Sequence, residues 1–170
     1  SVSSALRIVV DTHPGHHGAL QNEDSTEWAL RIAASLAQLA WRRGEAVELA
    51  MGSDVYRSTR GPDGLPPLLD ALARFAPAAT KPAGRFARGR AGLAADEWCV
   101  TTWRGWQAGR ERGAPPGMRW IVLDVDGQAS RASSAAAHGD TVFVTGSTRC
   151  VLEQFRRAWE GSRHDCGKIA

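Results

Sequence analysis

Long apolar runs, cysteine and lysine are all scarce in this chain of 170 residues. No stretch of the sequence approaches the roughly 18 apolar residues that a membrane-spanning helix requires. The three cysteines, Cys99, Cys150 and Cys166, lie far apart and in no C-x-x-C arrangement, which argues against a disulfide framework and against a structural zinc site. The chain is nevertheless long enough to bury a core of its own. These absences predict a soluble domain that folds on hydrophobic packing.

Lysine contributes only Lys81 and Lys168 to the 21 basic residues, so the formal net charge of +3 comes almost entirely from arginine. An arginine-rich and alanine-rich composition is typical of a GC-rich coding sequence and is weak evidence for phosphate binding. The basic excess lies in residues 78–117, above all in the run 81–90. This run predicts a solvated loop, with a docking surface for an acidic partner as the alternative. Nucleic-acid binding is disfavoured, because Phe86 is the one aromatic in the run that could stack on a base.

Short β-branched apolar runs alternate along the chain with segments of helical periodicity. We expect strands at residues 6–11, 46–51, 55–59, 97–103, 118–125 and 141–145. We expect helices at residues 25–43, 66–76 and 148–163, and loops at 78–96 and 104–117.

The alternation of strands and helices predicts an α/β fold of the Rossmann-like, three-layer kind, with a mostly parallel sheet covered on both faces. The polar strand at 55–59 is expected to form one antiparallel edge strand, because it follows a Gly-Ser-Asp turn. We find no internal repeat and expect residues 1–170 to form one domain, with 78–96 as a long loop or insertion.

Ligands of such sheets bind beyond the carboxyl ends of the strands, where the strand order reverses. This rule directs attention to Asp11, to residues 101–102 and to Asp124. No G-x-G-x-x-G motif follows the first predicted strand, and no Gly-Lys-Ser/Thr motif occurs, so the common nucleotide-binding loops are absent. Asp11 and the histidines at 13, 16 and 17 could supply ligands to a transition metal, although no regular spacing relates them.

Residues 122–127 resemble the first motif of haloacid-dehalogenase-type phosphotransferases, a strand that ends in Asp-x-Asp-Gly. In that resemblance Asp124 is the nucleophile and Asp126 the general acid or base. Gln128 departs from the family pattern, and no acidic pair follows that could hold Mg²⁺. A strand followed by a turn rich in Asp and Gly explains the run equally well. A Rossmann-like phosphohydrolase that uses Asp124 and Asp126, or Asp11, is therefore the enzymatic alternative.

Four segments of the first 77 residues carry a second resemblance. They are the strand that ends in Asp-Thr at 11–12, STEWALRIAASLA at 25–37, RRGEAVEL at 42–49 and LLDALA at 68–73. Together they resemble the domain-of-unknown-function family fifty-eight, bacterial proteins whose soluble part is a von Willebrand factor A-like domain. The family's membrane-spanning N-terminal segment does not occur in this sequence, so we expect the chain to be a soluble fragment of a longer protein.

This resemblance implies a non-enzymatic protein-interaction module of a bacterial membrane-associated protein. It implies a location on the cytoplasmic side of the membrane in the full-length protein. It also implies a protein partner, a MoxR-type AAA+ ATPase, with which the family acts in the assembly or maturation of complexes. The function, the location and the partner are implied by the family and its fold, and the residue patterns of this chain do not by themselves indicate them.

The resemblance also bears on metal binding. Von Willebrand A domains that bind Mg²⁺ hold it with Asp-x-Ser-x-Ser after the first strand, a Thr before a later helix and an Asp at the end of the fourth strand. Asp11 matches the first position, whereas His13 and Gly15 stand at the two Ser positions. The fourth predicted strand ends in Thr101 and Thr102 without an Asp. The implied site of Asp11, His13 and Thr101 is degenerate, and we expect no cofactor in it.

Trp103 ends the fourth predicted strand and Trp106 follows it, and both lie near Arg104 and Arg110 in the sequence. Trp and Arg are common anchors of protein interfaces, so an exposed protein-binding patch is one interpretation. Packing of both rings beneath the loop at 78–96 is the other. The sequence leaves both open.

The first prediction concerns metal affinity. Mg²⁺ favours octahedral oxygen ligands at about 2.1 Å, and one carboxylate with two hydroxyls does not supply them. We therefore predict that titration calorimetry will show Mg²⁺ and Mn²⁺ binding no more tightly than roughly the millimolar range. EDTA should leave the melting temperature unchanged. Micromolar binding, or a melting temperature that drops several degrees on chelation, would contradict this prediction.

Overall fold

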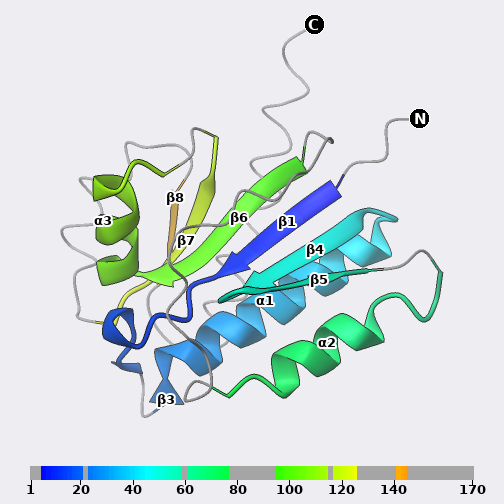
Figure 1. Cartoon of the computed structure of the whole chain (residues 1–170), viewed down its shortest axis with the longest axis horizontal. Coiled ribbons are helices and arrows are strands. Elements are labelled where there is room, and N and C mark those ends of the chain that lie inside the picture. The colour runs from blue at the N-terminus through cyan, green and yellow to red at the C-terminus, as the bar shows by residue number, and fades with distance from the viewer. Residues whose placement is uncertain are drawn as a thin grey trace, which may run out of the picture.

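Six strands form the central sheet of the computed structural model, which describes residues 5–20, 23–58, 61–76, 95–114, 117–125 and 141–144 (Figure 1). The strands are β1 (Ala5–Val10), β4 (Ala46–Met51), β5 (Asp54–Arg57), β6 (Ala95–Thr102), β7 (Arg119–Leu123) and β8 (Thr141–Val144). A separate ribbon pairs β2 (Ala19–Leu20) with β3 (Glu23–Asp24). The order of the sheet is β5-β4-β1-β6-β7-β8.

All neighbouring strands of the sheet are parallel except β5, which runs antiparallel to β4 at one end. The prediction of a mostly parallel sheet with one antiparallel edge strand is therefore confirmed. From β1 the chain proceeds outward to β4 and β5, and then returns to the other side of β1 to form β6, β7 and β8. The strand order thus reverses between β1 and β6, and their carboxyl ends mark the position where α/β sheets bind ligands.

Helices cover both faces of the sheet. They are α1 (Ser25–Arg42), α2 (Pro66–Ala73) and α3 (Trp103–Glu111), with a short 3-10 turn, η1 (Pro14–His16), after β1. α1 and α2 pack on one face and α3 on the other (Figure 1). α1 begins at Asp24, whose carboxylate accepts a 2.7 Å hydrogen bond from the Thr26 N–H, and ends before Gly44, whose φ of +75° favours glycine.

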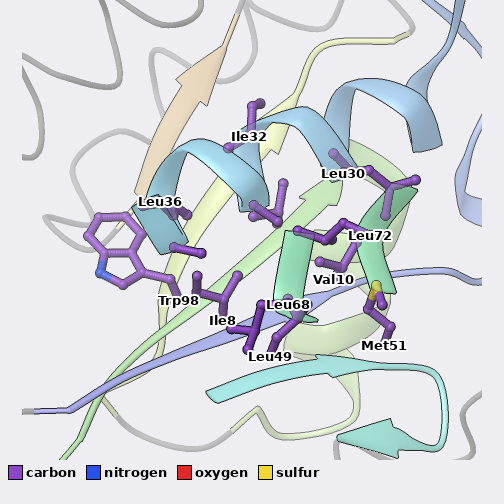
Figure 2. Close-up of a cluster of buried hydrophobic side chains, with 14 of the residues drawn as sticks. Ile8, Val10, Leu30, Ile32, Leu36, Leu49, Met51, Leu68, Leu72 and Trp98 are labelled. Carbon is purple, nitrogen blue, oxygen red and sulfur yellow. The ribbon is translucent and has the colours of Figure 1, made fainter. Parts of the chain in front are cut away.

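The main hydrophobic core lies between the sheet and α1 (Figure 2). Ile8 of β1 and Leu49 of β4 belong to this cluster together with Leu36 of α1 and Leu68 of α2. All four side chains are fully buried. The predicted helix at 25–43 therefore packs as its wide apolar face required.

A second, smaller cluster lies on the opposite face, beneath α3. It consists of Cys99, Trp106, Met118, Trp120 and Val122. Burial raises the pKa of the Cys99 thiol well above its ordinary value, with the nearby carboxylates Asp11 and Glu97 adding to the shift. Cys99 therefore packs as a small neutral hydrophobic residue rather than as a reactive thiolate.

The prediction of a loop at 104–117 is wrong over most of this segment, because α3 occupies Trp103–Glu111. The Thr102 hydroxyl accepts a 3.4 Å hydrogen bond from the Gly105 N–H at its first turn. The segment is mostly polar, and one face of the helix is apolar, so its composition did not indicate a helix. Trp106 lies on that apolar face and is only 4% exposed. The interpretation of Trp106 as an exposed interface anchor is thus also wrong, since the ring packs on the sheet. Trp103 is half-buried, with its ring 5.0 Å from that of Trp106.

Other expectations fall partly or wholly outside the described residues. The predicted helix at 148–163, the basic run at 81–90 and Asp126 lie there, as does all of the predicted loop at 78–96 except its last two residues, which begin β6. Among the described helices, none is long and apolar enough to cross a membrane.

One buried and two partly buried charges form a row across three strands, on the face of the sheet that carries α3. Arg7 of β1 lies opposite Glu48 of β4 and Glu97 of β6. Its Nε is 3.0 Å from Glu48 Oε1, and its Nη1 donates to Glu97 Oε1 at 3.2 Å. Glu48 also accepts a 2.7 Å hydrogen bond from Arg57 of β5. A buried arginine is tolerated here because a carboxylate pairs with it on each side.

The core generates a stability prediction. Leu36→Ala removes a fully buried side chain at the centre of α1 and should lower the free energy of unfolding by about 2–5 kcal/mol, measured by urea denaturation. Leu39→Ala in the same helix removes a half-buried side chain and should cost about 1 kcal/mol. Equal losses for the two variants would contradict the packing described for α1.

Candidate functional site

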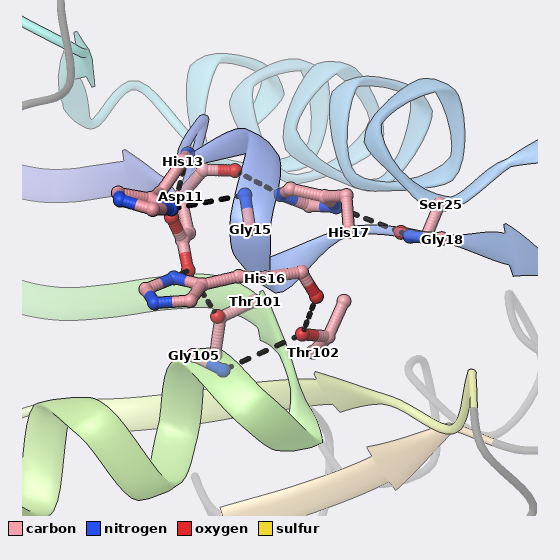
Figure 3. Close-up of polar contacts among 10 residues, drawn as sticks. All are labelled: Asp11, His13, Gly15, His16, His17, Gly18, Ser25, Thr101, Thr102 and Gly105. Carbon is pink, nitrogen blue, oxygen red and sulfur yellow. Dashed lines mark hydrogen bonds and ion pairs between the residues drawn. The ribbon is translucent and has the colours of Figure 1, made fainter.

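Asp11 lies where the strand order reverses. Its backbone N–H donates to the Val100 carbonyl at 2.9 Å, which extends the pairing of β1 with β6 by one residue. Its side chain therefore lies beside the end of β6, where Oδ2 accepts a 2.6 Å hydrogen bond from the Thr101 hydroxyl (Figure 3). The same oxygen is 2.7 Å from Nδ1 of His16, and Oδ1 accepts from the His13 N–H at 3.0 Å. Both carboxylate oxygens are thus engaged.

His16 binds Asp11 through one specific ring nitrogen. A carboxylate can only accept, so Nδ1 of His16 carries the hydrogen in this contact. Nε2 points away from Asp11 (Figure 3). The His16 carbonyl in turn accepts a hydrogen bond from the Thr102 hydroxyl, which ties the loop to the end of β6 a second time.

His17 connects the same loop to the start of α1. Its Nε2 is 2.5 Å from the Asp11 carbonyl oxygen, which can only accept, so Nε2 is the donor. Its Nδ1 is 2.8 Å from the Ser25 hydroxyl, and the Ser25 oxygen also accepts from the Gly18 N–H at 3.1 Å. A neutral imidazole with its hydrogen on Nε2 satisfies every one of these contacts. His17 therefore serves as a bridge within the loop rather than as a free ligand.

His13 is likewise committed to the loop. Its Nδ1 accepts a 3.0 Å hydrogen bond from the Gly15 N–H, and its ring stacks on that of His16 with centroids 4.4 Å apart. The structure brings the predicted ligands Asp11, His13 and Thr101 into one neighbourhood. Within the part of the chain that the structure describes, no group of three or more His, Cys, Asp or Glu side chains is placed to hold a metal ion.

Gly105, which the sequence analysis did not single out, closes the site from the side of α3. A Cβ atom at this position would collide with Thr101 Oγ1 and Asp11 Oδ2. Only a glycine lets the first turn of α3 approach the carboxylate so closely. The positive end of the helix dipole then lies near Asp11 and stabilises its negative charge. We call Asp11, His13, His16, Thr101 and Gly105 the Asp11 lock.

The Asp11 lock keeps this partly buried carboxyl ionised. Burial by itself raises the pKa of Asp11. Hydrogen bonds from His16, Thr101 and the His13 backbone, together with the positive charge that His16 can carry, outweigh burial and lower the pKa below its ordinary value. The ionised form is therefore the one that the fold stabilises.

The residues present do not fit the Mg²⁺ ion that the resemblance to von Willebrand A domains raises. Mg²⁺ would have to displace the donors that occupy both oxygens of Asp11. His13 and Gly15 provide no oxygen side chain where the metal-binding domains have serine. We therefore derive no chemistry through a metal ion.

Asp124 lies at the same edge of the sheet, one strand further along, directly after β7. Its side chain is half-buried. Its neighbour Val125 lies so close to Gly18 that a Cβ on Gly18 would be 3.1 Å from Val125 Cγ1. All three positions predicted from the strand ends thus share one edge, with Asp11 and Thr101 in direct contact.

No protein-family model, curated protein or solved structure matches this chain.

The lowered pKa of Asp11 predicts how stability depends on pH. A carboxyl whose pKa is depressed by folding contributes stability above its ordinary pKa and loses that contribution as the pH falls through the depressed value. Asp11→Asn should lower the free energy of unfolding by about 1–3 kcal/mol near pH 7, measured by urea denaturation. The difference from wild type should shrink below about pH 4. The exposed Asp63→Asn variant serves as the control, and an Asp11→Asn deficit that stays constant from pH 7 to pH 3 would contradict this assignment.

Proposed function

We propose that this chain is a non-enzymatic protein-interaction domain of the von Willebrand factor A type, in which the Asp11 lock replaces the metal ion. The observation that carries this proposal is the saturation of Asp11. Its two oxygens receive hydrogens from His13, His16 and Thr101, and Gly105 closes over them. A carboxylate held in this way fixes the loop in place and is a poor nucleophile or metal ligand.

The sheet supports the fold on which this proposal depends. Five parallel strands with one antiparallel edge strand, β5, are compatible with a Rossmann-like domain of this type. Asp11 follows β1, as the first metal ligand does in the metal-binding members. The difference lies in the side chains that surround it.

The proposed partner is a MoxR-type AAA+ ATPase, as the resemblance over the first 77 residues implies. In the full-length protein this domain would lie on the cytoplasmic side of the membrane. The carboxyl edge of the sheet offers a surface for such a partner, because Pro14 and Gly15 of η1 and Arg104 of α3 are exposed there. The Asp11 lock would hold this surface in one conformation without a metal ion.

The phosphohydrolase alternative finds less support in the described residues. Asp11 would need a free oxygen to attack phosphorus, and both of its oxygens accept hydrogen bonds. Asp124 lies at the correct edge of the sheet, whereas Asp126 is outside the described residues. We therefore place the enzymatic function second.

A binding experiment tests the proposal. The chain should bind a purified MoxR-type ATPase from the same bacterium in biolayer interferometry, with equal affinity in EDTA and in Mg²⁺ when no nucleotide is present. Arg104→Glu at the carboxyl edge should weaken binding at least tenfold. Arg42→Glu, at a position also exposed in the last turn of α1, should leave binding unchanged.

Two results would contradict this function. One is a lack of binding at concentrations up to the high micromolar range. The other is turnover of a generic phosphate ester with Mg²⁺ that Asp124→Asn abolishes, which would favour the phosphohydrolase.

A further inference from the structure

The free edge of β5 differs from the rest of the described surface. Val55 and Tyr56 are the exposed large hydrophobic side chains of the described residues, at 45% and 36%. They are adjacent in β5, so they project to opposite faces of the sheet. Within the part of the chain that the structure describes, β5 pairs with β4 alone and lies at one end of the sheet (Figure 1).

The backbone of β5 presents a regular set of groups to this open side. Ser58, directly after β5, donates its N–H to the Val47 carbonyl at 2.8 Å, so its backbone faces β4. Backbone direction alternates along a strand, and Asp54 and Tyr56 therefore also face β4. The N–H and C=O groups of Val55 and Arg57 face outward.

β5 carries two charged side chains, Asp54 and Arg57, and the second is paired with the neighbouring strand rather than directed past the edge. Exposed edges are commonly protected by charged side chains that extend beyond the strand. The Arg57 side chain is 68% exposed, but its Nε lies 2.7 Å from Glu48 Oε2 of β4, which holds its charge toward β4. Asp54 is the one acidic side chain that β5 presents.

We propose that β5 pairs antiparallel with β5 of a second copy of this chain, on a two-fold axis at Tyr56. This register places Val55 of one copy opposite Arg57 of the other, twice. Both residues direct their N–H and C=O groups outward, so each pair can exchange both backbone hydrogen bonds. The two sheets then continue into one, and the carboxyl edges of the two copies point in opposite directions.

The side chains also complement one another in this register. The Tyr56 rings of the two copies lie opposite each other on one face, where aromatic pairs stabilise sheets. Asp54 lies opposite Ser58 of the second copy. The Ser58 oxygen faces β4, where it accepts the Val47 N–H at 2.9 Å, so Asp54 meets a neutral residue across the axis rather than another carboxylate. No pair of like charges lies directly opposite, which is why a second copy suits this edge.

Sedimentation equilibrium combined with hydrogen exchange tests the pairing. Because the interface is small, we expect a reversible dimer with a dissociation constant of roughly 10–100 µM. The amides of Val55 and Arg57 should exchange fast in dilute protein and slow at least tenfold at concentrations where the dimer forms. The Tyr56 amide, bonded to β4, should be slow at both concentrations.

Two substitutions address the edge without removing a bond between β5 and β4. Val55→Pro deletes an outward N–H, and Val55→Thr is its matched control because it keeps the N–H and the branched side chain. Tyr56→Lys places two positive charges opposite each other at the axis. Val55→Pro and Tyr56→Lys should each weaken the dimer at least tenfold with unchanged circular dichroism, and Val55→Thr should not.

Three outcomes would overturn this proposal. The first is a monomer at every concentration up to about 500 µM, which exceeds the expected dissociation constant several-fold. The second is a dimer in which the Val55 and Arg57 amides exchange as fast as in the monomer, since another surface would then be paired. The third is a dimer that Val55→Pro and Tyr56→Lys leave intact.

Discussion

The hydrogen bond between Thr101 and Asp11 is the contact on which the carboxyl edge of this protein depends. It joins the ends of β1 and β6 where the strand order reverses, and it holds the carboxylate beneath the first turn of α3. The loop after β1 is arranged around the same residue. His16 binds its side chain and His17 binds its carbonyl. Without an ionised Asp11, the bonds from Thr101 and His16 to Oδ2 would weaken inside a partly buried site, whereas the bond from His17 to the backbone carbonyl would remain.

The same geometry explains how a metal site and a structural site can arise at one position of a fold. Parallel sheets concentrate polar side chains at the carboxyl ends of their strands, whichever chemistry they serve. In the metal-binding von Willebrand A domains, serine hydroxyls stand beside the aspartate that follows the first strand, and they can join it in binding a cation. Here two histidines donate to Asp11 directly, and a glycine brings a helix against it. Hydrogen-bond donors and the end of a helix dipole thus supply the positive potential around the Asp11 carboxylate.

The sequence predicted the α/β sheet, its antiparallel edge strand and the meeting of Asp11 with Thr101, because strand periodicity and the strand-end rule act locally. It did not predict α3, since an apolar face of two tryptophans on a polar helix produces little periodicity over nine residues. Gly105 and the pairing of Arg7 with two glutamates were also missed. Both depend on which strands and helices are neighbours in space, and this information appears only with the strand order.

A double-mutant cycle between Asp11→Asn and Thr101→Val tests the central claim most directly, because it isolates the contact between these two side chains. Unfolding free energies of the wild type, both single variants and the double variant would be measured in EDTA at pH 7. If Asp11 is a structural residue, the two losses should be strongly non-additive, with a coupling of about 1–3 kcal/mol. A coupling near zero would show that the Thr101–Asp11 hydrogen bond does not stabilise the fold and would contradict the account.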